Sequence, residues 1–288
     1  MNIGIIGLGL MGGSLGLALK KLPEKYTIIG YDHNPTHISD ALRLKLVDNI
    51  VHDFNEIKNC DVIILTIPVD AIIATAQTLT DVAPTCTIID FGSSKEKISN
   101  SIPLQIRTNF VTAHPMTGTE KFGPTAAIEE LYTEKTMVVC DVEKSGDLQK
   151  GVAIGIFKDI DAKIVFMEAN EHDRHAAFIS HMPHTVSFAL ANTVMKQEDP
   201  KSIIALAGGG FRSMSRIAKS SPNMWEDIFR QNKTNLLDSL NAFTTELALC
   251  QKMIEDEAWD ELHQWMIEAN KLHDICLLYT SPSPRDRT

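Results

Sequence analysis

A glycine-rich run close to the N-terminus, Gly7-Leu8-Gly9-Leu10-Met11-Gly12, follows an apolar stretch at residues 3–6. A helical pattern at residues 14–22 comes directly after it. A G-x-G-x-x-G run means little by itself, but between a strand and a helix it strongly indicates a dinucleotide-binding unit. The chain is therefore expected to begin with a strand, a tight turn and a helix that together hold a pyrophosphate.

Each part of this run has a physical task. Gly7 permits the tight turn, Gly9 lets the backbone approach a pyrophosphate, and Gly12 permits close packing of the helix on the strand. Leu10 and Met11 lie at the start of the helix, where backbone N–H groups point toward an anion. These five residues form the predicted pyrophosphate site.

Asp32 ends the second apolar run, about 20 residues beyond the glycines, where a carboxylate would bind the ribose hydroxyls. No arginine stands in His33-Asn34-Pro35, so a 2′-phosphate would meet a carboxylate and no guanidinium. This favours NAD over NADP. Thr66 and Pro68 end a third run, where their backbone is expected to line the cofactor site, although Pro68 equally suits the first turn of a helix.

Seven short β-branched runs alternate with helical patterns in the first half of the chain. They lie at residues 3–6, 27–31, 62–66, 87–90, 110–113, 136–140 and 163–166. Such alternation predicts an α/β Rossmann-like domain with a mostly parallel sheet and crossover helices. The run Val62-Ile63-Ile64-Leu65 is apolar throughout, as expected for a central strand that is covered on both faces.

After about residue 167 the strand pattern ends, and helix formers follow with apolar residues three to four apart. We expect a NAD-binding Rossmann-like domain at 1–167 and an all-α domain at 168–276, in which Pro183 kinks or restarts a helix. Residues 277–288 leave the helical pattern and resemble the translation of a sequencing adapter. They are interpreted as a non-native tail.

Composition bears on partners and location. Lys and Arg total 27 against 37 Asp and Glu, a formal charge of -10, so no nucleic acid partner is expected. No stretch approaches the roughly 20 apolar residues that span a bilayer. No targeting signal is visible at the start, and the five scattered cysteines suit reduced thiols better than disulfides. We expect a cytoplasmic protein without a membrane partner.

Two polar segments follow neighbouring strands, Asp90-Phe91-Gly92-Ser93-Ser94-Lys95 and His114-Pro115-Met116-Thr117-Gly118-Thr119-Glu120. Both are expected at the nicotinamide end of a bound cofactor. Oxidation of an alcohol needs an acceptor for the hydroxyl proton, and histidine suits that role near neutral pH. His114 is the candidate, although an isolated histidine at a strand end is more often structural.

Five motifs resemble those of prephenate dehydrogenases and occur in the same order as in that family. The resemblance extends over the chain up to about residue 275. They are the glycine run, Asp90-Phe91-Gly92-Ser93, the His114 to Glu120 segment, Ser180-His181-Met182-Pro183-His184, and Gly208-Gly209-Gly210-Phe211-Arg212 leading to Arg216. The resemblance implies a helical dimerisation domain, a homodimer, and NAD-dependent oxidative decarboxylation of prephenate to 4-hydroxyphenylpyruvate in tyrosine biosynthesis.

The same resemblance assigns roles to individual residues. Those expected at the reacting ring hydroxyl are the catalytic residues His114, Ser93 and His184. Those expected to bind the substrate are Arg216, Thr119 and Glu120. Prephenate carries two carboxylates, so a fixed guanidinium provides charge and geometry for one of them.

Other functions remain open at this point. Arogenate dehydrogenase acts on a substrate with an amine in place of the pyruvyl ketone, and the sequence does not separate the two enzymes. A β-hydroxyacid or imine reductase would be expected to use a lysine where this chain has His184 and Arg216. A non-catalytic NAD-binding module would keep the glycines and lose His114 and Arg216.

Several histidines share one predicted helix, together with an aspartate. They are His172, His175, His181 and His184, with Asp173. Spacing along a helix does not by itself provide the convergent geometry that zinc requires, so no metal site is predicted. His181 is interpreted as a packing or capping residue.

Overall fold

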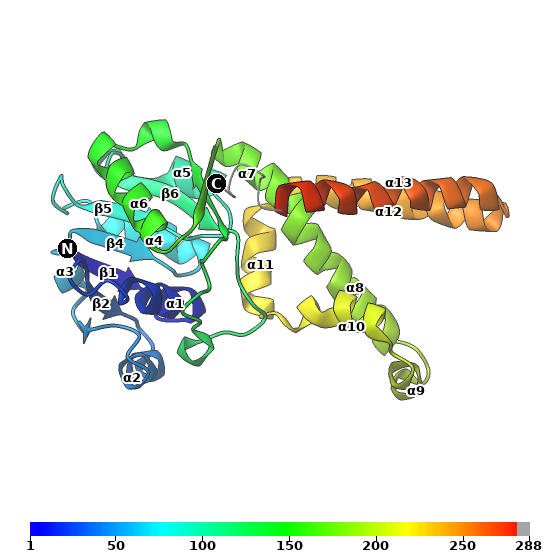
Figure 1. The fold of residues 1–288 in the computed structure, drawn as a ribbon, viewed down its shortest axis with the longest axis horizontal. Coiled ribbons are helices and arrows are strands. Elements are labelled where there is room, and N and C mark those ends of the chain that lie inside the picture. The colour runs from blue at the N-terminus through cyan, green and yellow to red at the C-terminus, as the bar shows by residue number, and fades with distance from the viewer. Residues whose placement is uncertain (281–288) are drawn as a thin grey trace, which may run out of the picture. The chain divides into compact units, whose positions relative to one another are not determined.

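A computed structural model describes residues 1–280 of the chain, and the side chains of all of these except 273 and 275–280. The chain forms two compact units, Met1–Leu236 and a second unit that begins at Leu237. The first unit combines a sheet with helices, and the second is helical (Figure 1).

An eight-stranded sheet is the centre of the first unit. Its strands are β1 (Asn2–Ile6), β2 (Thr27–Tyr31), β3 (Asn49–Ile50), β4 (Val62–Leu65), β5 (Thr87–Asp90), β6 (Phe110–Pro115), β7 (Thr136–Cys140) and β8 (Lys163–Met167). They follow the order β3-β2-β1-β4-β5-β6-β7-β8, and every neighbouring pair is parallel except β6 with β7. The predicted Rossmann-like, mostly parallel sheet is confirmed. The two-residue strand β3 was not predicted.

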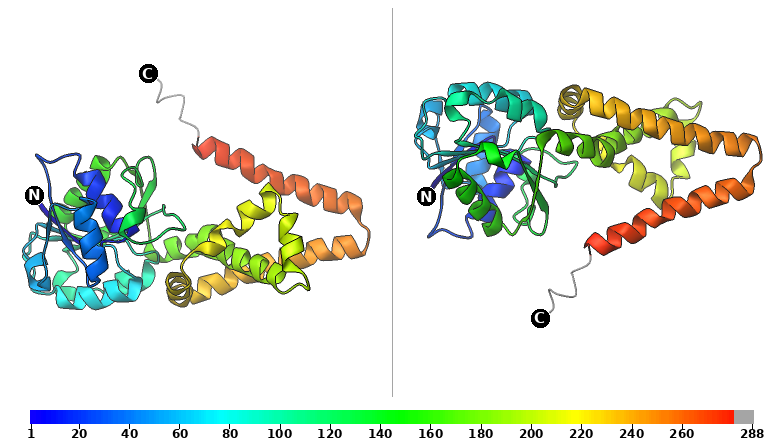
Figure 2. Two further views of the ribbon diagram at one scale, coloured as in Figure 1. Left: turned by 90° about the horizontal axis from the view of Figure 1, so that it is seen from below. Right: turned by 90° about the horizontal axis from the view of Figure 1, so that it is seen from above.

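Helices cover both faces of this sheet (Figures 1 and 2). They are α1 (Leu10–Leu19), α2 (Pro35–Arg43), α3 (Phe54–Ile57), α4 (Val69–Thr78), α5 (Glu96–Ser101) and α6 (Asp147–Asp159). Strand β4 explains the layering: Val62 and Ile64 join the core shared with α1 and α6. Ile63 and Leu65 join the opposite core with α3, α4 and α5. Alternate side chains of one strand thus fill two cores, as its continuous apolar run predicts.

In the described chain beyond β8, all regular structure is helical, as predicted. The elements are α7 (Ala169–Ala176), a π-helical turn η4 (Ala177–His181), α8 (Met182–Met195), α9 (Pro200–Ala205), α10 (Gly209–Ser215), a 3-10 turn η5 (Arg216–Lys219), α11 (Pro222–Gln231), α12 (Lys233–Glu255) and α13 (Trp259–Thr280). No helix among the described residues is long and apolar enough to cross a membrane.

Pro183 disturbs its helix through the π-helical turn η4, which lies between α7 and α8. A proline inside a helix lacks the N–H for one backbone bond, and its ring crowds the carbonyl four residues earlier. A π turn bonds residues five apart and so locally widens the helix. The predicted break at Pro183 is therefore present as an enlarged turn just before the proline.

The long helices α12 and α13 run antiparallel as a hairpin (Figure 2), and Trp265 Nε1 donates to Glu246 Oε2 at 2.9 Å. The expectation that the helical pattern ends near residue 276 is wrong, because α13 continues to Thr280 through the helix-forming pair Leu277-Leu278. Residues 281–288 lie outside the described residues. The non-native origin of 277–288 stays a prediction.

Candidate active site

A cavity of about 620 Å³ opens at the carboxyl ends of β1, β2 and β4. Its lining includes five of the predicted cofactor residues, which are Gly7, Gly9, Asp32, Thr66 and Pro68. The other three, Leu10, Met11 and Gly12, form the first turn of α1. The sequence therefore brings all eight residues to one edge of the sheet, where open α/β sheets bind ligands.

The glycines fit a dinucleotide pyrophosphate for three separate reasons. Gly7 has φ +96°, in the left-handed region that favours glycine. A Cβ on Gly12 would lie 2.0 Å from the Gly7 carbonyl oxygen, so only glycine allows α1 to pack this closely. A Cβ on Gly9 would meet no protein atom within 4 Å and would instead enter open space beside the start of α1. That space is where a phosphate would accept from the uncapped helix N–H groups.

Asp32 already makes three contacts within the protein. Its carboxylate accepts from the backbone N–H of Leu8 and of Asn34, both at 2.8 Å, and lies 3.1 Å from His37 Nδ1. A carboxylate has about four acceptor positions, so about one is left for a ribose hydroxyl. Asp32 therefore also fixes the glycine turn against the end of β2.

Two glycine substitutions should separate folding from cofactor binding. Gly12→Ala is expected to lower the free energy of unfolding by about 1–3 kcal/mol, because its methyl group overpacks the turn. Gly9→Ala should unfold like the wild type and yet bind NAD more weakly, because its methyl group occupies the phosphate space. Urea denaturation and calorimetric titration with NAD measure the two effects. Equal NAD affinity in Gly9→Ala and the wild type would contradict this placement of the phosphate.

The predicted chemical residues lie at the next two strand ends. His114 lies near the carboxyl end of β6. Ser93 follows β5, the strand that pairs in parallel with β6. Because Asp90 pairs with Thr112, Ser93 and His114 emerge at the same edge of the sheet. His114 Nδ1 lies 2.8 Å from His172 Nε2, a contact that the sequence pattern did not predict.

Burial strongly lowers the pKa of His114, and nearby His172, Lys95 and His181 lower it further. A lowered pKa keeps the imidazole neutral at physiological pH, and a neutral ring retains one nitrogen that can accept a proton. The site thus supplies the acceptor that oxidation of an alcohol requires.

Four buried charged or polar residues near His114 received no individual role from the sequence. Lys95 and Asp90 are both fully buried and form an ion pair, and Lys95 Nζ also donates to the Ala113 carbonyl at 2.7 Å. His172 and Asp173 are each 2% exposed. The available signals were the lysine at the end of the Asp90 to Lys95 segment and the adjacent His172-Asp173 pair. Neither signal indicates that these side chains are buried, and lysine in particular is usually exposed.

His184 stacks on Trp225, with ring centroids 3.6 Å apart and planes 24° apart. Its Nδ1 lies 2.9 Å from the Ser180 carbonyl oxygen, which can only accept, so Nδ1 carries a proton. Burial lowers the pKa of His184; the Ser180 carbonyl opposes this effect, and Arg216 adds to it. The neutral ring therefore has an unprotonated Nε2 close to the Arg216 charge.

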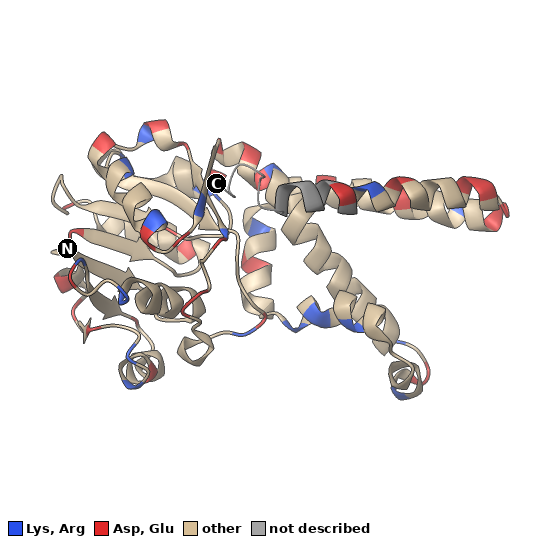
Figure 3. Cartoon of the chain, viewed as in Figure 1, with Lys and Arg blue, Asp and Glu red and all other residues tan. Residues whose placement is uncertain are grey.

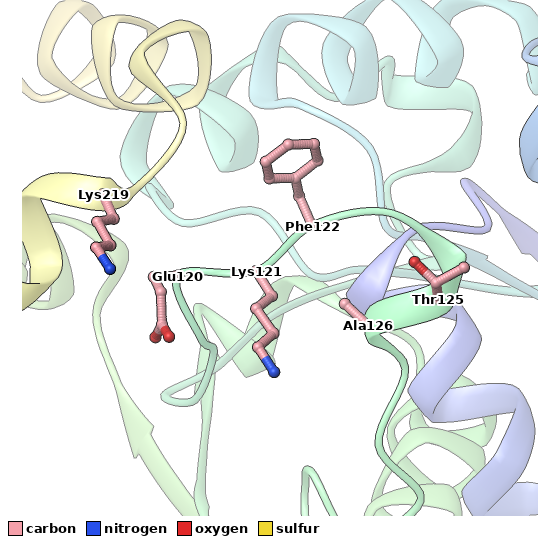
Figure 4. Close-up of a pocket in the computed structure, with 6 residues that line it drawn as sticks. All are labelled: Glu120, Lys121, Phe122, Thr125, Ala126 and Lys219. Carbon is pink, nitrogen blue, oxygen red and sulfur yellow. The ribbon is translucent and has the colours of Figure 1, made fainter.

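Arg216 and Glu120 face one another beside a second cavity of about 490 Å³. Arg216 Nη1 lies 3.5 Å from Glu120 Oε2, and the cavity is lined by Glu120, Lys121, Phe122, Thr125, Ala126 and Lys219. Figure 4 shows Glu120 and Lys121 on one side of their loop and Phe122 on the other. Basic residues gather over α10 and the turn after it (Figure 3). Thr119 accepts from the Lys121 N–H at 3.2 Å and so shapes this loop.

His181 is a packing residue, as interpreted from the sequence. It is 1% exposed, its Nδ1 lies 3.1 Å from Asn232 Nδ2, and its ring meets Trp225 edge-on. Burial lowers the pKa of His181 to about 4. The folded protein therefore holds this ring neutral where an exposed histidine would bind a proton.

The pH dependence of stability should report this residue. The folded pKa of about 4 lies below the ordinary value of 6.5, so the unfolded chain binds more protons between these values. The free energy of unfolding should therefore fall from about pH 6.5 toward pH 4, by on the order of 3 kcal/mol. His181→Gln should flatten this slope in urea denaturation, whereas exposed His33→Gln should not. An unchanged slope in His181→Gln would show that another group causes the acid sensitivity.

A glycine cradle at the carboxyl edge of the sheet and a neutral histidine at the same edge, on β6, define a dinucleotide-dependent dehydrogenase with a helical second domain. The prephenate dehydrogenase nucleotide-binding domain model matches residues 15–166, and the prephenate dehydrogenase dimerization domain model matches residues 168–268. The chain belongs to the prephenate dehydrogenase family and is an NAD-dependent oxidoreductase.

Individual relatives agree with this assignment. Prephenate dehydrogenase of Bacillus subtilis is 31% identical over 276 residues, which cover 94% of this chain and 74% of that protein. The crystal structure of prephenate dehydrogenase from A. aeolicus, in complex with hydroxyphenyl propionate and NAD+, has a TM-score of 0.89 and 31% identity and covers 96% of this chain and 98% of that one. Synechocystis arogenate dehydrogenase has a TM-score of 0.79 and 28% identity, with 95% and 99% of the chains covered.

Proposed function

We propose that this protein catalyses the NAD-dependent oxidative decarboxylation of prephenate to 4-hydroxyphenylpyruvate in tyrosine biosynthesis. The observation that carries the proposal is the neutral, partly buried His114, which lies at the same edge of the sheet as the dinucleotide cradle. The family match to both domains and the A. aeolicus complex with hydroxyphenyl propionate and NAD+ support it.

In this proposal His114 accepts the proton of the ring hydroxyl, and Ser93 at the same sheet edge assists by hydrogen bonding. When bound, NAD takes the hydride from the same ring carbon. The hydroxyl carbon then becomes a ketone. As the ring carboxylate leaves as carbon dioxide, the electron pair of the broken bond passes through the ring to the ketone oxygen, which takes the proton back from His114 and completes the aromatic phenol. Loss of carbon dioxide and aromatisation make the reaction effectively irreversible.

Arg216 is proposed to bind a substrate carboxylate. Its side chain is 60% exposed and its guanidinium makes only a long contact to Glu120, so a bidentate carboxylate can replace that partner. Thr119 and Glu120 form the loop beside this anion site. The second active-site histidine, His184, is fixed by Trp225 and Ser180 next to the Arg216 charge, which suits a role in orienting the substrate.

The direct test is NADH formation by purified protein with NAD and either prephenate or arogenate. Prephenate-dependent turnover would support the proposal. Turnover with arogenate alone would show that the substrate is the amine analogue. Arogenate is the second candidate because Synechocystis arogenate dehydrogenase is one of the similar structures. Absence of turnover with both substrates, despite measured NAD binding, would overturn the proposal in favour of a non-catalytic NAD-binding module.

Removal of the Arg216 guanidinium should weaken substrate binding more than chemistry. Arg216→Ala is expected to raise KM for prephenate by about 10- to 100-fold, because it removes a hydrogen-bonded pair of opposite charges. The change in kcat should be smaller. Arg216→Lys should recover only part of this, because an ammonium cannot bind a carboxylate bidentately. Exposed Arg212→Ala is the matched control and should leave KM unchanged. A KM in Arg216→Ala equal to that of the wild type would exclude the anion-binding role.

The same proposal includes a homodimer formed through the helical domain at 168–276 and a cytoplasmic location. The match to a dimerization domain supports the first. Free buried thiols at Cys60, Cys86 and Cys140 support the second, since reduced cysteines are typical of the cytoplasm. Light scattering coupled to size-exclusion chromatography tests the dimer, and a single-chain mass would contradict it.

A further inference from the structure

A continuous line of hydrogen bonds runs from Asp173 through His172 to His114. Asp173 Oδ1 lies 2.8 Å from His172 Nδ1, and His172 Nε2 lies 2.8 Å from His114 Nδ1. Asp173 also accepts from two backbone N–H groups, Lys95 at 2.7 Å on Oδ1 and Glu96 at 3.0 Å on Oδ2. The metal interpretation of these histidines is disfavoured, because His172 already uses both ring nitrogens.

With both rings neutral, the direction of every proton in this line follows from its fixed end. Backbone N–H groups can only donate, so the Asp173 carboxylate acts as the acceptor and His172 Nδ1 must carry the proton it donates. A neutral His172 then has a bare Nε2, which must accept from His114 Nδ1. The second nitrogen of neutral His114, Nε2, is therefore left without a proton.

We propose that His172, oriented by Asp173, is a positioning residue that holds His114 in the tautomer with an unprotonated Nε2. The catalytic consequence rests on the proposed function. During the reaction the substrate O–H bond breaks and a bond from His114 Nε2 to that proton forms, so His114 becomes a cation. The His114 Nδ1–H remains hydrogen-bonded to His172 Nε2. The negative charge of Asp173, on the other side of the His172 ring, stabilises the His114 cation.

Neighbouring contacts hold this line in place. Asn232 Nδ2 donates to the Asp173 carbonyl at 2.7 Å and also lies 3.1 Å from His181 Nδ1, so that it links α7 to the π-helical turn η4. Lys95 Nζ donates to the carbonyl of Ala113, the residue before His114. Both ends of the hydrogen-bond line are thus fixed by buried groups, which suits an orienting role.

Two substitutions of His172 separate orientation from packing. His172→Phe keeps the ring shape and removes the acceptor, whereas His172→Gln places an amide oxygen near the former Nε2. We expect kcat to fall by at least about 10²-fold in His172→Phe, since loss of the orienting partner in a serine protease triad costs about 10⁴-fold. His172→Gln should recover much of that loss, and KM should change little in both. His175→Gln, on the exposed side of α7, is the control.

The tautomer itself is measured by imidazole ¹⁵N chemical shifts of His114 in the NAD-loaded protein. The wild type and His172→Gln should show a protonated Nδ1, and His172→Phe should lose this preference. An Nε2–H tautomer in the wild type, or a His172→Phe enzyme more active than His172→Gln, would overturn the inference. Absent turnover in the wild type would defeat the proposed function alone, because the chemical shifts would still decide the tautomer.

Discussion

Replacing His114 by Asn is expected to lower kcat for prephenate by about 10²- to 10⁴-fold, the usual contribution of a positioned proton acceptor. The Asn amide can still hydrogen-bond the substrate but cannot take a proton from the ring hydroxyl. NAD affinity should stay near that of the wild type, because His114 lies outside the cavity lined by the glycine turn. Initial rates of NADH formation and titration with NAD measure these two quantities.

The control for this variant is His52→Asn, an exposed histidine of the same domain. It should retain the kcat of the wild type. A His114→Asn enzyme with nearly normal kcat would show that another group, such as Ser93 through water, accepts the proton. A parallel loss of NAD binding would instead indicate a general disturbance of the sheet edge.

Replacing Lys95 by Met should lower the free energy of unfolding by about 3–5 kcal/mol, because it leaves the Asp90 carboxylate buried without its partner. The Ala113 carbonyl also loses its donor. The double variant Asp90→Asn with Lys95→Met should be more stable than the single variant, since it removes both charges together. Urea denaturation followed by circular dichroism measures the three proteins.

Lys97 provides the matched control, because its side chain is half exposed and its contact with Asp70 is 3.4 Å long. Lys97→Met should change the free energy of unfolding by no more than about 1 kcal/mol, as for surface ion pairs generally. If Lys95→Met were as harmless as Lys97→Met, the buried pair would have no stabilising role. A double variant less stable than the single one would show that the Asn and Met side chains pack poorly.

The sequence predicted the sheet well because buried parallel strands carry an unambiguous pattern. Val62-Ile63-Ile64-Leu65 can hardly be anything except a central strand, and the glycine run identifies the turn after β1. The two-residue β3 has no such pattern, since Asn49 and Ile50 form a strand only by pairing with β2. Short edge strands of this kind are set by tertiary context.

The hydrogen-bond line under His114 could not be predicted for a different reason. Its members come from β6 and α7, and nothing in their spacing shows that these elements meet. His172 and Asp173 gain meaning only once α7 packs beside α5, where two backbone N–H groups reach the carboxylate. Sequence reasoning identified the residue that is proposed to meet the substrate and missed the residues that are proposed to orient it.

The π-helical turn η4 sets the rotational phase of everything that follows it in α8. Each residue added to or removed from a helix turns the downstream side chains by about 100°. Deletion of one residue between Ala177 and His181 is expected to remove this wider turn and to change the angle at which His184 meets Trp225. The number of residues in this segment is therefore constrained by the direction in which His184 must point. Insertions or deletions that keep this direction would have to add or remove close to a whole helical turn.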